Sequence, residues 1–313
     1  MRKHHVYVTF VIASYVAAMT AIAQGTVSAN GVDFTYLTAG EGPLALCLHG
    51  FPDTAHGWRH LLPRLAEAGY RAVAPFQRGY APTSVPADGR FQSGVLGVDA
   101  NALHETLGGD SNAVIIGHDW GASGTHAAAM LEPHRWNKVV TMAVPPGAAI
   151  GMSFLTNVQQ LRRSWYMFFF QSPLSDLVVP GNDLAFIDFL WSDWSPGYEA
   201  SADVAHVKDA LRNPANLSAA LGYYRATLGE GYKDPELDAA QMATAGEPTQ
   251  PMLYLHGRND GCIGVEVAEL AASMAPANIT VEIVDGAGHF LHLEQPDVVN
   301  DRILGFLAER TSG

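Results

Sequence analysis

The chain is poor in cysteine and in charged side chains, and these shortages exclude several kinds of site. Its two cysteines, Cys47 and Cys262, lie in or beside apolar segments, and neither belongs to a Cys-x-x-Cys pair. A zinc site or a redox pair is therefore disfavoured, and we expect two buried free thiols. The sequence also has no internal repeat and no run of basic residues.

The charge that is present is mostly negative. Charged residues make up 16% of the 313 residues, and 31 acidic residues against 18 lysines and arginines give a net charge of −13. Such a surface disfavours nucleic acid and anionic membranes as partners. Hydrophobic residues make up 48%, which fits a globular core. The length suits one large α/β domain with an insertion.

A long apolar run occurs only near the N-terminus. Basic MRKHH precedes an uncharged stretch from Val6 to Ala23, which ends in the small-x-small pattern Ala21-Ile22-Ala23. This pattern predicts an export signal within residues 1–25 and a periplasmic or secreted protein. An uncleaved anchor is one alternative, because the stretch is longer than most signals. A translation start further downstream, which leaves a cytoplasmic protein, is the other.

After residue 30, short apolar segments alternate with helical patterns. The alternating segment 32–37 predicts an edge strand, and continuous apolar runs predict buried strands at 44–50, 71–75, 113–117 and 138–145. Helices are expected around Trp58–Leu65, over 95–107 and from Gly121 onward. Strands that alternate with helices predict a doubly wound, mostly parallel sheet.

The alternation stops between Pro145 and about Gly246. Aromatic helical segments replace the strands there, at 164–171, 184–191 and 217–228, and strands return at 251–257 and 279–284 before a last helix over 297–309. We therefore expect an α/β core over 26–146 and 247–313 with an inserted all-helical cap over 147–246. A cap above the carboxyl ends of the strands would enclose a substrate pocket.

The segment GHDWGA (117–122) places Asp119 where the central strand turns sharply into a helix. Gly117 and Gly121 leave room for such a turn, which in many hydrolases holds a nucleophile. The helix N-terminus favours a negative charge there. Asp119 alone could equally be a helix cap, and its expected partners favour catalysis.

Those partners follow the last two strands. His289, in GAGHF, fits a general base, and Asp260 would fix its tautomer. An ordinary Asp-Gly turn is the alternative for Asp260, and His292 is expected to pack or cap. No carboxylate cluster with ligand spacing accompanies the histidines, so we expect no metal.

The segment HGFPD (49–53) follows a buried strand. We expect the backbone N–H groups of Phe51 and Trp120 to form an oxyanion hole, and His49 to organise the loop. A carboxylate nucleophile suits displacement at saturated carbon, giving an alkyl-enzyme ester that water activated by His289 hydrolyses. The leaving group would be an epoxide oxygen or a halide, and no cofactor is needed.

HGFPD, GHDWGA, Asp260 and GHF together resemble the α/β-hydrolase fold family, specifically its epoxide hydrolase branch, over nearly the whole chain after residue 30. The resemblance implies two cap tyrosines that donate to the epoxide oxygen. YMFFFQ and GYYRA match their patterns and assign Tyr166 and Tyr224, with Tyr223 pointing elsewhere. Aromatic core packing is the alternative for each. The implied substrates are a small apolar epoxide and water, and the product is a vicinal diol.

Two other functions stay open. A haloalkane dehalogenase shares the Asp-Trp turn but needs a second halide donor beside Trp120; cap candidates are Trp165, Trp191 and Trp194, which match no dehalogenase spacing. A ligand binder without turnover is the second. The loop 75–84 departs from the family's usual turn and is predicted to be structural, although Gln77 or Tyr80 could contact substrate. The sequence does not indicate the oligomeric state.

Overall fold

The computed structural model describes residues 20–309. Most of the predicted export signal therefore lies outside the described residues. Within residues 20–309, no helix combines the length and the apolar character needed to cross a membrane.

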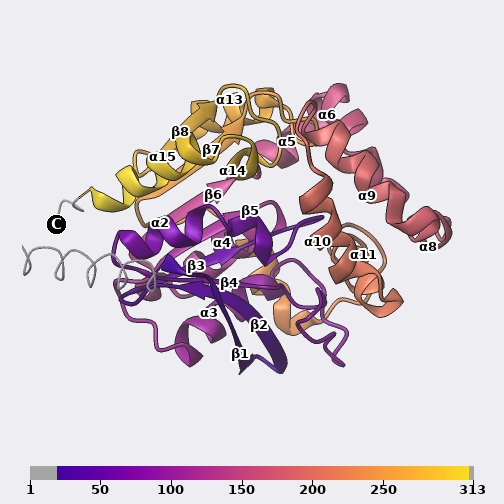
Figure 1. Cartoon of the computed structure of the whole chain (residues 1–313). Coiled ribbons are helices and arrows are strands. Elements are labelled where there is room, and N and C mark those ends of the chain that lie inside the picture. Colours follow the sequence, from indigo (N-terminus) through magenta and orange to yellow (C-terminus); the bar gives the residue numbers. More distant parts are fainter. Residues whose placement is uncertain (1–19, 310–313) are drawn as a thin grey trace, which may run out of the picture.

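An eight-stranded sheet forms the centre of the structure, in the order β1-β2-β4-β3-β5-β6-β7-β8 (Figure 1). β1 and β2 run antiparallel to their neighbours, and the remaining pairs are parallel. The strands are β1 (Ala23–Ala29), β2 (Val32–Ala39), β3 (Leu44–Leu48), β4 (Arg71–Pro75), β5 (Val114–His118), β6 (Lys138–Met142), β7 (Met252–Gly257) and β8 (Ile279–Val284). The mostly parallel sheet agrees with the prediction.

The edge-strand prediction for residues 32–37 is wrong. β1 pairs with β2 along its whole length, so β1 is the edge and β2 lies inside the sheet. β1 has the sequence AQGTVSA, which contains little apolar character, and its exposure is high. Its strand conformation comes from pairing with β2, for which the local sequence carries no signal.

Helices cover both faces of the sheet. α2 (Leu61–Glu67) and α15 (Pro296–Ala308) pack together, and α3 (Val95–Thr106) packs on α4 (Trp120–Leu131). The buried side chains divide into two apolar clusters, one of which extends into the helical insertion. α13 (Val265–Met274) connects β7 to β8, and α14 (Leu291–Glu294) lies between β8 and α15 in the chain.

An all-helical insertion connects β6 to β7 and stands at one end of the sheet (Figure 1). Its helices are α5 (Ala149–Thr156), α6 (Val158–Arg163), α7 (Trp165–Phe169), α8 (Ser175–Val178), α9 (Gly181–Trp194), α10 (Ser201–Leu211), α11 (Pro214–Leu228) and α12 (Asp238–Ala243). α12, the last helix of the insertion, packs against α3 and α4 of the α/β core.

A buried ion pair holds the loop after β4. Arg78 is fully buried and donates from Nε and Nη2 to the two carboxylate oxygens of Asp99 at 2.6 and 2.7 Å. Asn30 adds a third hydrogen bond to Asp99, at 2.7 Å. Gln77 and Tyr80, on the same loop, contact His49: the Gln77 N–H donates to His49 Nε2 at 2.9 Å, and the Tyr80 ring packs edge-on against it. Both lie outside the cavity described below.

We expect Asp99→Ala to lower the free energy of unfolding by about 3–5 kcal/mol, because it removes the buried partner of the Arg78 guanidinium and leaves only the exposed Asp88 carboxylate, at 3.5 Å, as a counter-charge. Urea unfolding followed by circular dichroism measures this. The matched control is Asp301→Ala, which removes an exposed partner of Arg64 and should cost at most about 1 kcal/mol. If the two variants lose the same amount of unfolding free energy, the buried Arg78–Asp99 pair does not stabilise the protein more than an exposed pair does.

Candidate active site

Asp119 occupies the turn between β5 and α4. Its backbone is in a sparsely populated region, with φ 53° and ψ −123°, and is held there by close packing of the chain around it. A Cβ on Gly121 would come within 2.1 Å of the Leu48 carbonyl oxygen, so the turn depends on glycine there. The geometry exposes the Asp119 carboxylate at the carboxyl end of the central strands.

The loop after β3 lies directly against this turn. The Phe51 N–H donates to Asp119 Oδ1 at 2.7 Å. A Cβ on Gly50 would approach Asp119 Oδ1 to 2.3 Å and the Trp120 nitrogen to 2.5 Å, which shows how closely the two segments meet. The two amides predicted to form an oxyanion hole therefore lie beside one carboxylate oxygen, and the other oxygen, Oδ2, is left toward His289.

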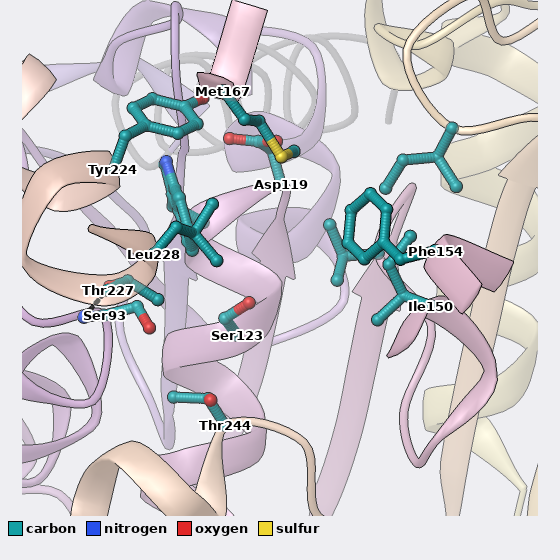
Figure 2. Close-up of a pocket in the computed structure, with 13 residues that line it drawn as sticks. Ser93, Asp119, Ser123, Ile150, Phe154, Met167, Tyr224, Thr227, Leu228 and Thr244 are labelled. Atoms are coloured by element: carbon teal, nitrogen blue, oxygen red, sulfur yellow. Dashed lines mark hydrogen bonds between the residues drawn. The ribbon is translucent and has the colours of Figure 1, made fainter. Parts of the chain in front are cut away.

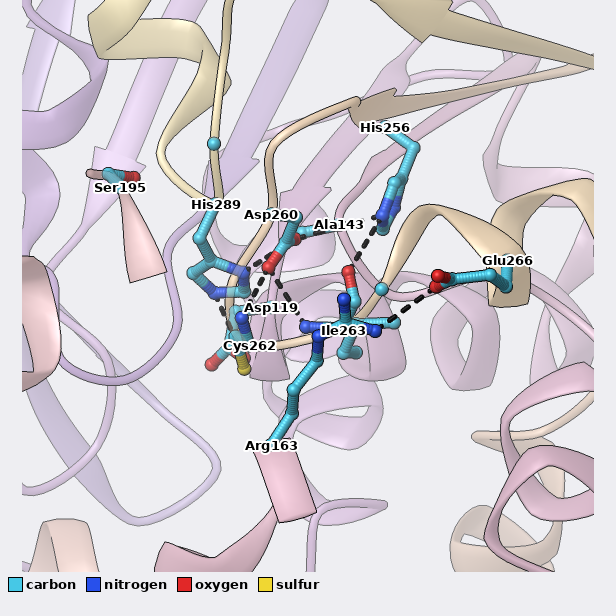
Figure 3. Close-up of polar contacts among 12 residues, drawn as sticks. Asp119, Ala143, Arg163, Ser195, His256, Asp260, Cys262, Ile263, Glu266 and His289 are labelled. Carbon is cyan, nitrogen blue, oxygen red and sulfur yellow. Dashed lines mark hydrogen bonds and ion pairs between the residues drawn. The ribbon is translucent and has the colours of Figure 1, made fainter. Parts of the chain in front are cut away.

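His289 and Asp260 reach the same place from the loops after β8 and β7 (Figure 3). His289 Nδ1 lies 2.9 Å from Asp260 Oδ2, and His289 Nε2 lies 3.6 Å from Asp119 Oδ2. The other oxygen of Asp260 accepts from the backbone N–H groups of Cys262 and Ile263, at 2.7 and 2.8 Å. Asp260 is thus fixed by two amides while it orients the imidazole, and His289 Nε2 faces the carboxylate of Asp119.

Two opposing effects set the pKa of His289. Burial by itself lowers it, but the carboxylates of Asp260 and Asp119 outweigh burial and raise it to about 10. The imidazole is therefore protonated at neutral pH while Asp119 is free, and the two form a buried ion pair.

This shift predicts a pH-dependent stability. An unperturbed histidine has a pKa of about 6.5, so the contribution of His289 is complete below about pH 6.5 and is lost as the pH rises toward 10. We expect the difference in unfolding free energy between the wild type and His289→Gln to shrink over that range. Urea titrations at intervals from pH 6 to 10 measure it, and a constant difference would contradict the raised pKa.

The cap tyrosines lie above Asp119. Burial, and then nearby groups that include Asp119, raise the pKa values of Tyr166 and Tyr224 well above the usual value, so both phenols are neutral. Their rings meet edge to face with centroids 5.6 Å apart. The Tyr166 hydroxyl contacts Cys262 Sγ at 3.3 Å, and the Tyr224 hydroxyl points toward Asp119 (Figure 2). Tyr223 instead donates to the Arg78 carbonyl at 2.9 Å, so of the two adjacent tyrosines it is Tyr224 that faces the site.

A cavity of about 130 Å³ opens beside Asp119 (Figure 2). Its walls are mainly apolar and come from both the core and the insertion: Asp119, Trp120, Val144, Ile150, Phe154, Met167, Tyr224, Leu228 and Ile263, with Ser93, Ser123, Thr227 and Thr244. A second cavity, lined by Phe154, Met167, Phe168, Gln171 and Leu228, shares three of these residues. The shared residues place the two cavities next to each other, and the exposure of Phe168 and Leu228 places the second one at the surface near α7 and α11.

A model of the alpha/beta hydrolase fold matches residues 43–296. The chain belongs to the α/β-hydrolase fold family. Epoxide hydrolase 4 of Homo sapiens is 30% identical to it over 90% of this chain and 77% of its own length. Epoxide hydrolase A of Mycobacterium tuberculosis is 29% identical over 92% of this chain and 98% of its own.

Solved structures agree. A Bacillus megaterium epoxide hydrolase in complex with an inhibitor superposes with a TM-score of 0.77 at 26% identity, over 91% of this chain and all of that one. Within the α/β-hydrolase family, the chain therefore falls in the branch of the epoxide hydrolases, as its motifs indicated.

The tryptophans proposed as halide donors lie in different surroundings. The Trp120 indole lines the cavity, and its N–H is buried without a partner in the described part of the chain. Trp191 donates to the Pro52 carbonyl at 2.9 Å, and Trp165 packs on Phe186. Trp194 packs against His289 with centroids 5.0 Å apart but does not line the cavity. No second indole therefore joins Trp120 at the wall of this cavity.

His292 lies below the site rather than in it. Its Nε2 is 3.5 Å from Asp53 Oδ2, and its ring stacks on Trp58. Within residues 20–309, two groups have side-chain atoms close enough together to hold a metal ion: Asp53, His118 and His292 form one, and Asp260, Cys262 and His289 form the other. Asp260 is already engaged by two amides and His289, and His118 Nε2 by the His289 carbonyl, whereas Asp53 Oδ2, His118 Nδ1 and both ring nitrogens of His292 have no hydrogen bond among the described residues.

Sequence reasoning missed two contacts that hold the site together. The Trp194 carbonyl, at the end of α9, accepts from the backbone N–H groups of both Gly261 and His289 at 3.0 Å. This one acceptor ties the loops of Asp260 and His289 to the insertion. Cys262, expected only as a buried thiol, is both buried and free and also contacts Tyr166. Both contacts join segments far apart in the chain, so no local pattern could reveal them.

Proposed function

We propose that the protein hydrolyses epoxides to vicinal diols through a covalent ester on Asp119. The arrangement that supports the proposal is the position of the Asp119 carboxylate, which lies between the His289–Asp260 pair on one side and two neutral tyrosines on the other. Asp119 Oδ1 is held by the Phe51 N–H, so Oδ2 is the oxygen free to attack an epoxide carbon. As the new C–O bond forms, the ring C–O bond breaks, and the oxygen takes a proton from Tyr224 or Tyr166.

Hydrolysis of the ester follows at the same carboxyl group. His289 takes a proton from water, the hydroxide oxygen adds to the Asp119 carbonyl carbon, and the Phe51 and Trp120 N–H groups stabilise the oxyanion on Oδ1. The bond between the Asp119 carboxyl carbon and the ester oxygen Oδ2 then breaks. Oδ2 leaves as a hydroxyl of the diol after it takes the remaining proton of the attacking water, and the oxygen from water completes the regenerated carboxylate. The tyrosinate recovers its proton from the His289 imidazolium before water attacks, so His289 is neutral when it takes the proton from water and is a cation again when the carboxylate is regenerated. The cycle therefore consumes one epoxide and one water. No cofactor or metal enters these steps.

Haloalkane dehalogenation is the alternative that shares the nucleophile. The observation in its favour is that the buried indole N–H groups of Trp120 and Trp194 both lack a hydrogen bond of normal geometry within residues 20–309. The experiment gives the purified protein styrene oxide and a 1-bromoalkane in parallel and follows diol and free bromide. Diol without bromide supports the proposal. Bromide without diol assigns the dehalogenase. If neither product forms, and the wild type and Asp119→Asn bind an epoxide equally well, the protein is a ligand binder without turnover.

We also propose that residues 1–23 direct export. Cleavage after Ala23 would leave Gln24 to Ala29 of β1 with their pairing to β2. N-terminal sequencing of protein recovered from the periplasm or medium is expected to begin at Gln24. A protein that starts at Met1 in the membrane fraction would indicate the anchor, and one that remains in the cytosol would contradict export.

A further inference from the structure

The cavity beside Asp119 has a polar end that the proposed chemistry does not use. Its apolar walls separate Asp119 and Tyr224 from a group of four hydroxyl side chains, Ser93, Ser123, Thr227 and Thr244. Figure 2 shows Ser123 on the helix that begins beside Asp119, with Ser93 and Thr227 at about the same level in this view and Thr244 further from Asp119. A purely alkyl or aryl substrate would bury this end against carbon.

Two of the four hydroxyls, those of Ser93 and Thr244, already donate a hydrogen bond within the protein. Ser93 Oγ donates to Gln241 Oε1 at 3.3 Å and accepts from Gln241 Nε2 at 2.9 Å. Thr244 Oγ1 donates to the Gln241 carbonyl at 2.7 Å. Gln241 therefore satisfies this pair, and they form the fixed floor of the cavity.

The other two, Ser123 and Thr227, have a proton to give. Thr227 Oγ1 accepts from the Ser93 N–H at 2.9 Å and has no acceptor for its own proton among the described residues. Ser123 is only 7% exposed, lines the cavity and has no side-chain hydrogen bond within residues 20–309. Both hydroxyls line a mainly apolar cavity, where a hydrogen bond to an acceptor on a bound ligand would add to the binding free energy.

The charge of the residues around the cavity limits which hydrogen-bond acceptor a ligand can place beside Ser123 and Thr227. Among the residues that line it, only Asp119 is charged, and it is acidic. An anionic acceptor would meet no counter-charge and would be repelled by the nucleophile. The acceptor must therefore be neutral, as an ether or ester oxygen is.

From these observations we infer that the preferred substrates are epoxides with an apolar arm that carries a neutral oxygen acceptor, bound by the hydroxyls of Ser123 and Thr227. This inference rests on the proposed function. Ser123 follows Asp119 by four residues, about 6 Å along a helix axis. An oxygen separated from the epoxide ring by a short chain of methylene groups spans such a distance.

The test compares 1,2-epoxyoctane with its isostere 1,2-epoxy-6-methoxyhexane, as the ratio of kcat/KM for ether over alkane. One recovered hydrogen bond corresponds to about a five- to tenfold change. We expect that ratio to fall by this factor in Ser123→Ala/Thr227→Val, mainly through KM, because the contact is made equally in ground and transition states. Thr227→Ser, which keeps the hydroxyl, should keep the ratio. Thr106→Val, on the exposed face of α3, is the matched control outside the cavity and should also keep it.

Binding of the two product diols to the wild type and the double variant, measured by titration calorimetry, separates this inference from the proposed function. Diol formation from both epoxides with a ratio that the double variant leaves unchanged overturns the inference and leaves the function intact. If neither epoxide is turned over, but the wild type binds the ether diol more tightly than the alkane diol and the double variant does not, the inference is supported and the proposed function is overturned. No turnover and no change in binding preference overturns both.

Discussion

His289→Gln is expected to stop turnover and leave the protein with a covalent ester on Asp119. Attack on the epoxide needs only the Asp119 carboxylate and the tyrosine donors, whereas hydrolysis of the ester needs a base for water. Glutamine fills the same space without a basic nitrogen, so the first step proceeds and the second slows by about 10²–10⁴-fold. Intact-mass measurement after incubation with styrene oxide should show a gain of one substrate mass, and peptide mapping should place it on Asp119.

The control for this experiment is Asp119→Asn/His289→Gln, which lacks the nucleophile and should gain no mass. Turnover at the wild-type rate by His289→Gln would exclude His289 as the base. A mass gain at another residue would exclude Asp119 as the nucleophile and point to adventitious alkylation.

The raised pKa of His289 is compatible with its action as a base, because its charge partner changes during the cycle. Asp119 is one of the two carboxylates that hold the pKa at about 10 in the free enzyme. Once Asp119 is an ester, it carries no charge, and the pKa of His289 falls while Asp260 still orients the ring. In the proposed cycle the imidazole therefore becomes a usable base only after the ester has formed and its proton has passed to the tyrosinate, which is the order of the two proposed steps.

The sheet and the triad could be predicted from the sequence because their signals are local. Each buried strand is a short apolar run, and Asp119, Asp260 and His289 each follow one. The ends of parallel strands meet at one edge, so the topology alone brings the three residues together. Ser123 was also within reach, because a residue four after Asp119 on a helix faces the same side.

The features that the sequence could not show are contacts between residues that lie far apart in the chain. β1 is a strand only because β2 offers its edge, and the Trp194 carbonyl matters only because two loops from the other end of the chain reach it. Whether Ser123 and Thr227 are free donors depends on where Gln241 and Ser93 lie. Hydrogen-bond satisfaction is a property of the folded structure, and no spacing rule encodes it.

Replacement of both cap tyrosines, Tyr166→Phe/Tyr224→Phe, is expected to lower kcat for epoxide opening by about 10²–10⁴-fold. Each phenylalanine keeps the ring in the aromatic packing and removes only the hydroxyl. The Tyr224 hydroxyl makes no hydrogen bond of normal geometry in the described structure, although it interacts with the Trp120 side chain. The single variants should slow the reaction less, because either neutral phenol can still protonate the leaving oxygen. Single-turnover formation of the Asp119 ester, followed by quenched mass analysis, measures the step directly.

Tyr223→Phe is the matched control, since it removes a hydroxyl from the adjacent residue of α11 that donates to the Arg78 carbonyl and not into the cavity. It should open epoxides at close to the wild-type rate. A halide leaves as an anion without needing a proton, so a dehalogenase would release bromide from a 1-bromoalkane equally well with and without the two hydroxyls. Loss of epoxide opening in the double variant, with Tyr223→Phe active, therefore assigns the proton to Tyr166 and Tyr224, whereas full activity in the double variant would mean that the epoxide oxygen is protonated by another donor.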